Sequence, residues 1–168
     1  MSAAFARLRD RVWRAILLGM GLGAAPLAPG TFGTLGGVLL AVPLGALLDG
    51  AALVLALSGI ALGLFLVGCA SGRAIVRLFG REDPGCVVLD EIVGYLVVVA
   101  IDAALHGRPG PWTHALAFVL FRIFDVLKLP PARRAEELPG GLGVMADDVV
   151  AAVQAAAGLW LLHAFGLP

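Results

Sequence analysis

Mostly apolar stretches separated by short polar segments dominate this sequence. They cover residues 34–48, 51–70, 86–105, 112–127 and 146–167. A helix that crosses a bilayer needs about 20 predominantly apolar residues, with a range near 17–25. The second, third and fifth stretches reach this length, whereas the first and fourth need flanking residues. The pattern predicts an all-α fold: a small polytopic membrane helical bundle with about five membrane-embedded helices.

The N-terminal segment has a different periodicity. Apolar side chains recur there at helical spacing, at Phe5, Leu8, Val12 and Ile16. Four arginines lie between them. The pattern predicts a basic amphipathic helix over residues 4–20, which suits an anionic membrane surface. A cleaved signal peptide is the alternative interpretation, because basic residues precede an apolar run and the alanine pair at 24–25.

Basic residues indicate how the bundle is oriented. Three clusters lie within residues 7–14, 73–81 and 128–134. If successive stretches cross in alternating directions, all three clusters fall on one face, which the positive-inside rule makes cytoplasmic. We therefore expect a multi-pass protein of the cytoplasmic (inner) membrane, with its N-terminus inside and its C-terminus outside.

Composition narrows the class of protein further. Hydrophobic residues make up 60% of the chain and charged residues 14%, against about 25% charged in ordinary soluble domains. These values exclude a disordered chain and disfavour a soluble globule. The 12 basic and 12 acidic residues cancel, so we expect no nucleic-acid partner. The two cysteines, Cys69 and Cys86, are too few for a disulfide framework.

Five acidic residues occupy positions within or beside the apolar stretches, where charge is rare and usually functional. They are Asp90, Glu91, Asp125, Asp147 and Asp148. On the predicted topology, all five gather from three helices near the cytoplasmic boundary. Simpler roles are open for single members: the pair at 147–148 could cap a helix, and Asp125 could pair with Arg122 or Lys128.

The acidic cluster as a whole points to a metal. Carboxylates gathered at the edge of a low-dielectric region repel one another unless a cation is present. Oxygen ligands in small number suit Mg²⁺, which is commonly completed by water and substrate phosphate. The sequence therefore predicts a Mg²⁺ site formed by the five acids.

Two glycine-rich segments, 29–34 and 140–143, precede apolar stretches at the same boundary. Amide groups at a helix N-terminus bind anions, although glycine also permits close packing of membrane helices. Arg122, Asp125 and Lys128 are spaced to share one helical face. The resulting candidates for phosphate binding are Gly30, Thr31, Gly33, Arg122, Lys128, Gly140 and Gly141.

Familiar nucleophilic motifs do not fit this sequence. The three histidines, His106, His114 and His163, fall near the opposite boundary, away from the acids. Neither cysteine is followed six residues later by arginine, and no serine lies in a G-x-S-x-G motif. We therefore assign no catalytic role to histidine, cysteine or serine.

Four ordered motifs carry a family resemblance. They are residues 28–34 (APGTFGT), 90–94 (DEIVG), 121–125 (FRIFD) with Lys128, and 140–148 (GGLGVMADD). Over residues 15–160 the chain resembles the phosphatidylglycerophosphatase A family. The resemblance departs at Leu129, where proline is typical after the lysine, and at Pro139, where histidine can precede the glycines.

The resemblance implies a small membrane enzyme that uses Mg²⁺ to remove the terminal phosphate of phosphatidylglycerol phosphate, giving phosphatidylglycerol. Residues 1–168 would form a single phosphatase domain, with residues 28–168 as its catalytic core. The nucleophile stays open between water, a covalent aspartyl phosphate and Thr31. Another lipid-phosphate hydrolase, a small transporter and a membrane scaffold are the alternatives to this function.

Overall fold

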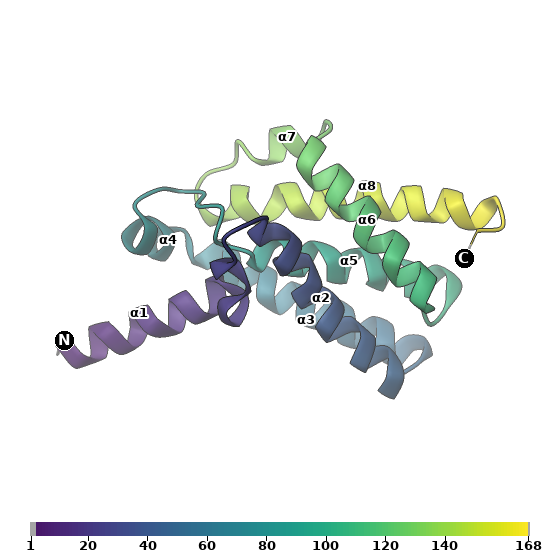
Figure 1. The fold of residues 1–168 in the computed structure, drawn as a ribbon, viewed down its shortest axis with the longest axis horizontal. Coiled ribbons are helices and arrows are strands. Elements are labelled where there is room, and N and C mark those ends of the chain that lie inside the picture. The colour runs from purple at the N-terminus through teal and green to yellow at the C-terminus, as the bar shows by residue number, and fades with distance from the viewer. Residues whose placement is uncertain (1–2, 168) are drawn as a thin grey trace.

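The computed structural model describes residues 3–167, and these fold into helices without a β-strand (Figure 1). The predicted all-α class is confirmed. The elements in chain order are α1 (Ala3–Leu17), the 3₁₀ helix η1 (Gly19–Ala24), α2 (Pro29–Leu47), α3 (Gly50–Ala70), α4 (Gly72–Phe79), α5 (Leu89–His106), α6 (Pro111–Leu127), α7 (Ala132–Ala135) and α8 (Gly141–Ala164).

The five long helices correspond to the five apolar stretches. Of these, α2, α3 and α8 are long and apolar enough to cross a membrane, so the chain is a membrane protein. The other two, α5 and α6, have 18 and 17 residues and carry charges. At about 1.5 Å per residue, each covers about 26 Å of a hydrocarbon layer roughly 30 Å thick.

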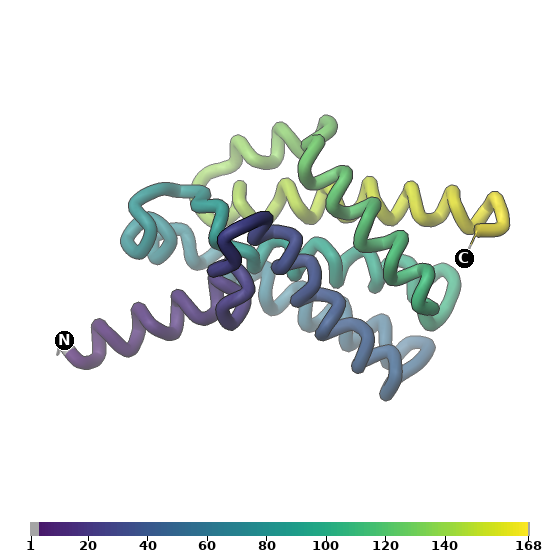
Figure 2. The backbone as a smooth tube through the Cα atoms, viewed as in Figure 1, coloured from purple at the N-terminus to yellow at the C-terminus, as the bar shows by residue number. Residues whose placement is uncertain are grey.

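The long helices alternate in direction. The starts of α2, α5 and α8 lie at one end of the bundle, together with the ends of α3 and α6 (Figure 2). Close approaches support this arrangement: Gly33 in α2 lies against Val88, just before α5, and Gly141 in α8 lies against Cys69 in α3. Functional groups at the starts of three helices therefore meet at a single end.

Helix α5 is the central element of the bundle. It packs against α2, α3 and α8, and its buried residues point in all directions around its axis, as Leu96, Val98 and Val99 illustrate. Lipid offers no hydrophobic drive for helix association, so membrane helices depend on close packing at small residues. Gly37 of α2 fulfils this role beside the ring of Tyr95. The start of α5 is thereby fixed at the centre of one end.

The N-terminal amphipathic helix is present but ends earlier than residue 20. Helix α1 finishes at Leu17, because the backbone turns through positive φ angles of 54°, 58° and 108° at residues 19–21. Its apolar residues Phe5, Leu8 and Val12 are 49–59% exposed. This exposed apolar stripe on a basic helix is typical of a helix that lies on a membrane surface.

Two long helices begin five residues before the apolar stretches that predicted them. Helix α2 begins at Pro29 and α8 begins at Gly141, so both glycine-rich segments lie largely within helices. Proline suits the first helical position because its φ is already helical. The acid pair at 147–148 consequently lies in the second turn of α8 and does not cap it; Gly140, with φ 62°, occupies the N-cap position.

Candidate active site

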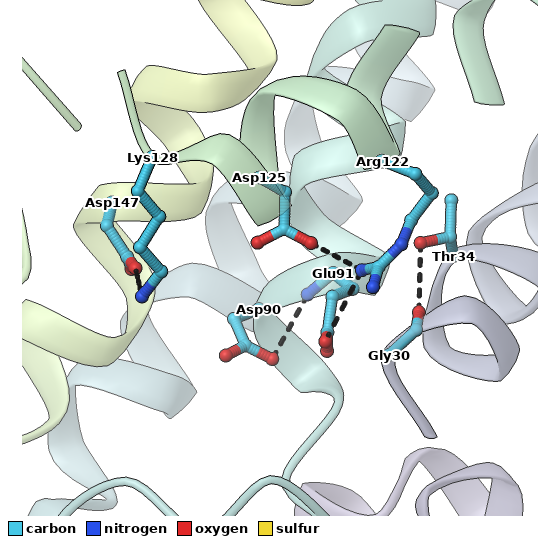
Figure 3. A network of polar contacts seen from close by, with 8 residues as sticks. All are labelled: Gly30, Thr34, Asp90, Glu91, Arg122, Asp125, Lys128 and Asp147. Atoms are coloured by element: carbon cyan, nitrogen blue, oxygen red, sulfur yellow. Dashed lines mark hydrogen bonds and ion pairs between the residues drawn. The ribbon is translucent and has the colours of Figure 1, made fainter. Parts of the chain in front are cut away.

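A polar cavity of about 290 Å³ lies at the end of the bundle where α5 and α8 begin and α6 ends. The five acids predicted from the sequence all line it: Asp90, Glu91, Asp125, Asp147 and Asp148. Figure 3 shows side chains of α5, α6 and α8 meeting beside the start of α2. The alternating helix directions thus bring together residues that are up to 58 positions apart in the chain (148 − 90).

Three of the carboxylates form a compact group. Asp90, Glu91 and Asp148 each offer an oxygen, and these oxygens lie within 4.8 Å of one another. Within the described residues, the buried atoms Glu91 Oε2 and Asp148 Oδ2 have no hydrogen-bond partner. A buried oxygen without a partner is costly, and like charges at this separation repel. The donor set fits a hard divalent cation that would supply the missing interactions.

Arg122 connects α5 and α6 beside this group. Its Nη1 donates to Asp125 Oδ2, one turn further along α6, and lies 3.6 Å from Glu91 Oε1 (Figure 3). The side chains of Arg122, Glu91 and Asp125 are only 11–19% exposed. A guanidinium carries five N–H donors, so Arg122 can hold these carboxylates and still bind an anion.

Lys128 occupies the other side of the cavity. The helix ends at Leu127, and Lys128 has a left-handed backbone with φ 46°, so it does not continue the helical face of Arg122 and Asp125 as predicted. This turn directs Nζ to within 2.8 Å of both Asp147 Oδ2 and Glu136 Oε1.

The charge of Lys128 follows from these contacts. Burial lowers the pKa of Lys128, but hydrogen bonds and charge interactions with Asp147 and Glu136 outweigh burial and raise that pKa above its ordinary value. Lys128 is therefore cationic throughout the neutral pH range.

The first glycine segment brings α2 close to the charged groups. A Cβ on Gly30 would collide with Glu91 Oε1 and lie 2.9 Å from Arg122 Nη1, and one on Gly33 would lie 3.2 Å from Glu91 Oε2. The Thr31 amide donates to the Ala28 carbonyl at 2.9 Å. The glycines thus permit close packing at the site, the simpler of the two roles weighed for them.

The second glycine segment packs α8 against α3. A Cβ on Gly141 would collide with the Gly68 carbonyl and lie 2.7 Å from the Cys69 carbonyl oxygen. Of the predicted phosphate-binding residues, those that line the cavity are Arg122, Lys128 and Gly140. The remaining ones, which do not line it, are Gly30, Thr31, Gly33 and Gly141.

Sequence reasoning missed three acids that also line the cavity: Glu82, Asp83 and Glu136. Their position in polar segments directly before α5 and α8 was the available signal. The histidines were placed correctly at the opposite end. His106 ends α5, 16 residues after Asp90, which corresponds to about 24 Å along the helix.

The four motifs around this cavity have a recognised counterpart. Residues 15–163 match the family model described as phosphatidylglycerophosphatase A. The chain belongs to the phosphatidylglycerophosphatase A family. It is accordingly an enzyme, a phosphatase, and the resemblance stated from its motifs is confirmed.

Relatives match the phosphatase over most of its length. A phosphatidylglycerophosphatase A of Haemophilus influenzae is 39% identical over 141 residues, covering 83% of this chain and 82% of its own. That of Escherichia coli is 30% identical over 151 residues, covering 89% and 83%. A Bacteroides thetaiotaomicron protein, provisionally named a phosphatidylinositol-3-phosphatase, is 36% identical over 140 residues, covering 82% and 86%. No solved structure matches the chain.

Proposed function

We propose that this phosphatase hydrolyses the terminal phosphate of phosphatidylglycerol phosphate in a Mg²⁺-dependent reaction at the cytoplasmic face of the inner membrane. The product would be phosphatidylglycerol. The family membership and the names of two relatives support the substrate. The observation that carries the chemistry is the compact group of Asp90, Glu91 and Asp148, with buried oxygens that lack a partner among the described residues.

In this proposal, Asp90, Glu91 and Asp148 would hold Mg²⁺, and Asp125 and Asp147 would complete the acidic lining of the cavity. Asp125 already forms an ion pair with Arg122, and Asp147 forms one with Lys128. When bound, Mg²⁺ supplies positive charge to the phosphoryl oxygens.

The two cations of the cavity would bind the phosphate. Arg122 suits planar, bidentate contact with phosphate oxygens, and Lys128 adds a second positive charge from the opposite side. A water molecule attacks phosphorus and gives a proton to a cavity carboxylate. As the phosphorus–oxygen ester bond breaks, that carboxylate returns the proton to the departing oxygen, so that the alcohol leaves. Fixed positive charge around the transferring group stabilises the transition state.

The membrane geometry agrees with a lipid substrate. Apolar helices extend away from the cavity in one direction, so the acyl chains can stay in the bilayer while the headgroup enters from the rim. Basic residues of α1, α4 and α7 surround the same end of the bundle (Figure 1). That distribution supports a cytoplasmic orientation under the positive-inside rule.

The decisive experiment measures phosphate release by the purified protein from three lipids: phosphatidylglycerol phosphate, phosphatidic acid and phosphatidylinositol 3-phosphate, each with and without Mg²⁺. We expect release from the first lipid only, and only with Mg²⁺. The third lipid tests the function named for the Bacteroides relative. Equal release from it would identify a different lipid-phosphate hydrolase, and release from none would favour a transporter.

Two substitutions connect the activity to the cavity. Asp148→Asn and Asp125→Asn should each lower turnover by about a hundredfold or more, because each removes charge that the proposed site uses. Asp49→Asn, in the exposed turn between α2 and α3 at the opposite end, is the matched control and should behave like wild type. Wild-type turnover in both cavity variants would contradict the proposed site.

A further inference from the structure

A second polar cluster lies at the far end of the bundle, where α5 and α8 finish. It consists of Asp102 and His106, one turn apart on α5, and His163 in the last turn of α8. His106 Nδ1 and His163 Nε2 each lie 3.0 Å from the same carboxylate oxygen, Asp102 Oδ1. The two imidazole rings are 4.2 Å apart between centroids. Nothing in the phosphatase chemistry uses these residues.

The burial of this cluster is unusual for a charged group. The Asp102 side chain is only 3% exposed, on a helix whose neighbouring residues are apolar, whereas the side chains of His106 and His163 are 30% and 18% exposed. A carboxylate at such a position requires compensation, and an intramembrane acid points to a functional site. The two partly exposed imidazoles leave a route from solvent to the buried oxygen.

We propose that Asp102, His106 and His163 form a second metal site, which binds a divalent transition metal of the Zn²⁺ type. Their three donor atoms lie within 4.8 Å of one another, a spacing that fits around a single ion. Zinc bonds to imidazole nitrogen and carboxylate oxygen are about 2.0–2.2 Å long, and three protein ligands with one open position are common.

The ligand chemistry separates this site from the acidic cavity. Imidazole suits Zn²⁺, Co²⁺ and Ni²⁺, whereas Mg²⁺ prefers oxygen ligands alone. A neutral imidazole carries one N–H and one lone pair. When each ring holds its proton on the outward nitrogen, His106 Nδ1 and His163 Nε2 present their lone pairs beside the carboxylate oxygen. Binding therefore needs only a change of tautomer in side chains that already converge.

Such an ion would cross-link the ends of two helices. His163 lies 61 positions after Asp102, so the ion would join the last turns of α5 and α8. Anything that binds the folded state alone adds to its stability in proportion to ligand concentration and affinity. The site thus has a readout that does not depend on phosphatase activity.

The test is a titration of the full-length protein in detergent, stripped with a chelator and then supplied with Co²⁺ in the presence of excess Mg²⁺. The excess Mg²⁺ competes for the carboxylate cavity. A rise in visible absorption reports transfer of Co²⁺ from water to a protein site of lower coordination number, and thermal unfolding with Zn²⁺ reports stabilisation. We expect one equivalent of bound Co²⁺ and a higher unfolding temperature with Zn²⁺.

Three variants decide the assignment. His163→Gln and His106→Gln should each weaken Co²⁺ binding by more than the roughly 10–100-fold that loss of a second-shell partner costs. His114→Gln is the matched control, because His114 lies near the same end but contacts the Tyr95 hydroxyl at 2.8 Å. If the His163 variant does not fold, the His106 variant provides the test, because His106 is partly exposed. Absent Co²⁺ binding, or equal loss in the control, would overturn the proposal. The cluster would then serve only to hydrogen-bond α5 to α8.

Discussion

The Glu91 side chain is closely packed on two sides. Arg122 lies on one side of it and the backbone of α2 on the other, with no room for a side chain at residue 30. The glycine therefore sets how near α2 can come to the charged group. Gly30 thus matters because it has no side chain. A substitution at this position tests that role without removing any charge from the cavity.

We predict that Gly30→Ala lowers phosphatase activity by roughly tenfold or more while the protein still folds. The added Cβ would displace Glu91 and Arg122 together, and overpacking of this kind costs about 1–3 kcal/mol. Phosphate release and the unfolding temperature are the measurements. Gly59→Ala, where a Cβ would meet nothing within 4 Å, is the control and should leave both unchanged or slightly raise stability. Equal behaviour of the two variants would contradict this role of Gly30.

The contribution of Lys128 to folding stability should depend on pH. Its pKa is higher in the folded state than its ordinary value, because its bonds to Asp147 and Glu136 outweigh burial. A raised pKa contributes stability that is fully present below the unfolded-state pKa and is lost as pH rises through the folded-state value. The contribution of Lys128 should thus be constant near neutral pH and decline only in strong alkali.

We predict that Lys128→Met destabilises the protein by about 1–3 kcal/mol, because it leaves the buried Asp147 carboxylate without its donor. The partial exposure of Lys128 favours the lower half of that range. Chemical unfolding in detergent provides the measurement. The double variant with Asp147→Asn should recover stability but not activity, since the uncompensated charge is gone. Additive losses in the double variant would show that the two residues are not coupled.

At the scale of elements, hydropathy predicted the five long helices but not where two of them begin. Glycines and a proline at the starts of α2 and α8 resemble loop residues, yet both segments are helical because close helix–helix packing favours small residues there. The left-handed turn at Lys128 was also beyond prediction, since it depends on the contact with α8. Local pattern thus predicted the elements, and packing decided their ends.

Helix α8 should be sensitive to a single methyl group at its start. In Gly141→Ala, the new Cβ would press on the backbone carbonyls of Gly68 and Cys69, which cannot rotate away. We predict a loss of about 1–3 kcal/mol in stability and a marked fall in activity, because α8 carries two of the cavity acids. Thermal unfolding and phosphate release measure these effects. Gly63→Ala, on an open face of α3, provides the comparison, and equal stability of the two variants would argue against this packing.

For the whole molecule, the gathering of the five acids was predictable because alternating spans send every second loop to the same side. Charge position along the sequence was then enough to place Asp90, Asp125 and Asp148 together. The individual side-chain pairings were not predictable, because they depend on the geometry between neighbouring helices. The cluster at Asp102 and His163 illustrates this limit, because only the packing of α5 against α8 brings His163 Nε2 to 3.0 Å from Asp102 Oδ1.

Orientation in the membrane can be tested on the intact bundle. Single cysteines at Asp49 and Glu137, in a background without Cys69 and Cys86, lie at opposite ends of the bundle. We predict that an impermeant thiol reagent added outside intact cells labels position 49 and spares position 137, because the basic clusters favour the cytoplasm at the cavity end. Labelling after lysis controls for reactivity, and the reverse pattern in intact cells would invert the proposed topology.

The position of the cavity at one end of an apolar bundle has a consequence for product release. Under the proposed function, the two products enter different phases as they form. The lipid product diffuses away in the plane of the bilayer, whereas inorganic phosphate is diluted in the aqueous compartment. Neither product leaves along the path of the other, so the release of one does not block the release of the other. An active site at this boundary thus delivers each product directly to the phase in which it is soluble.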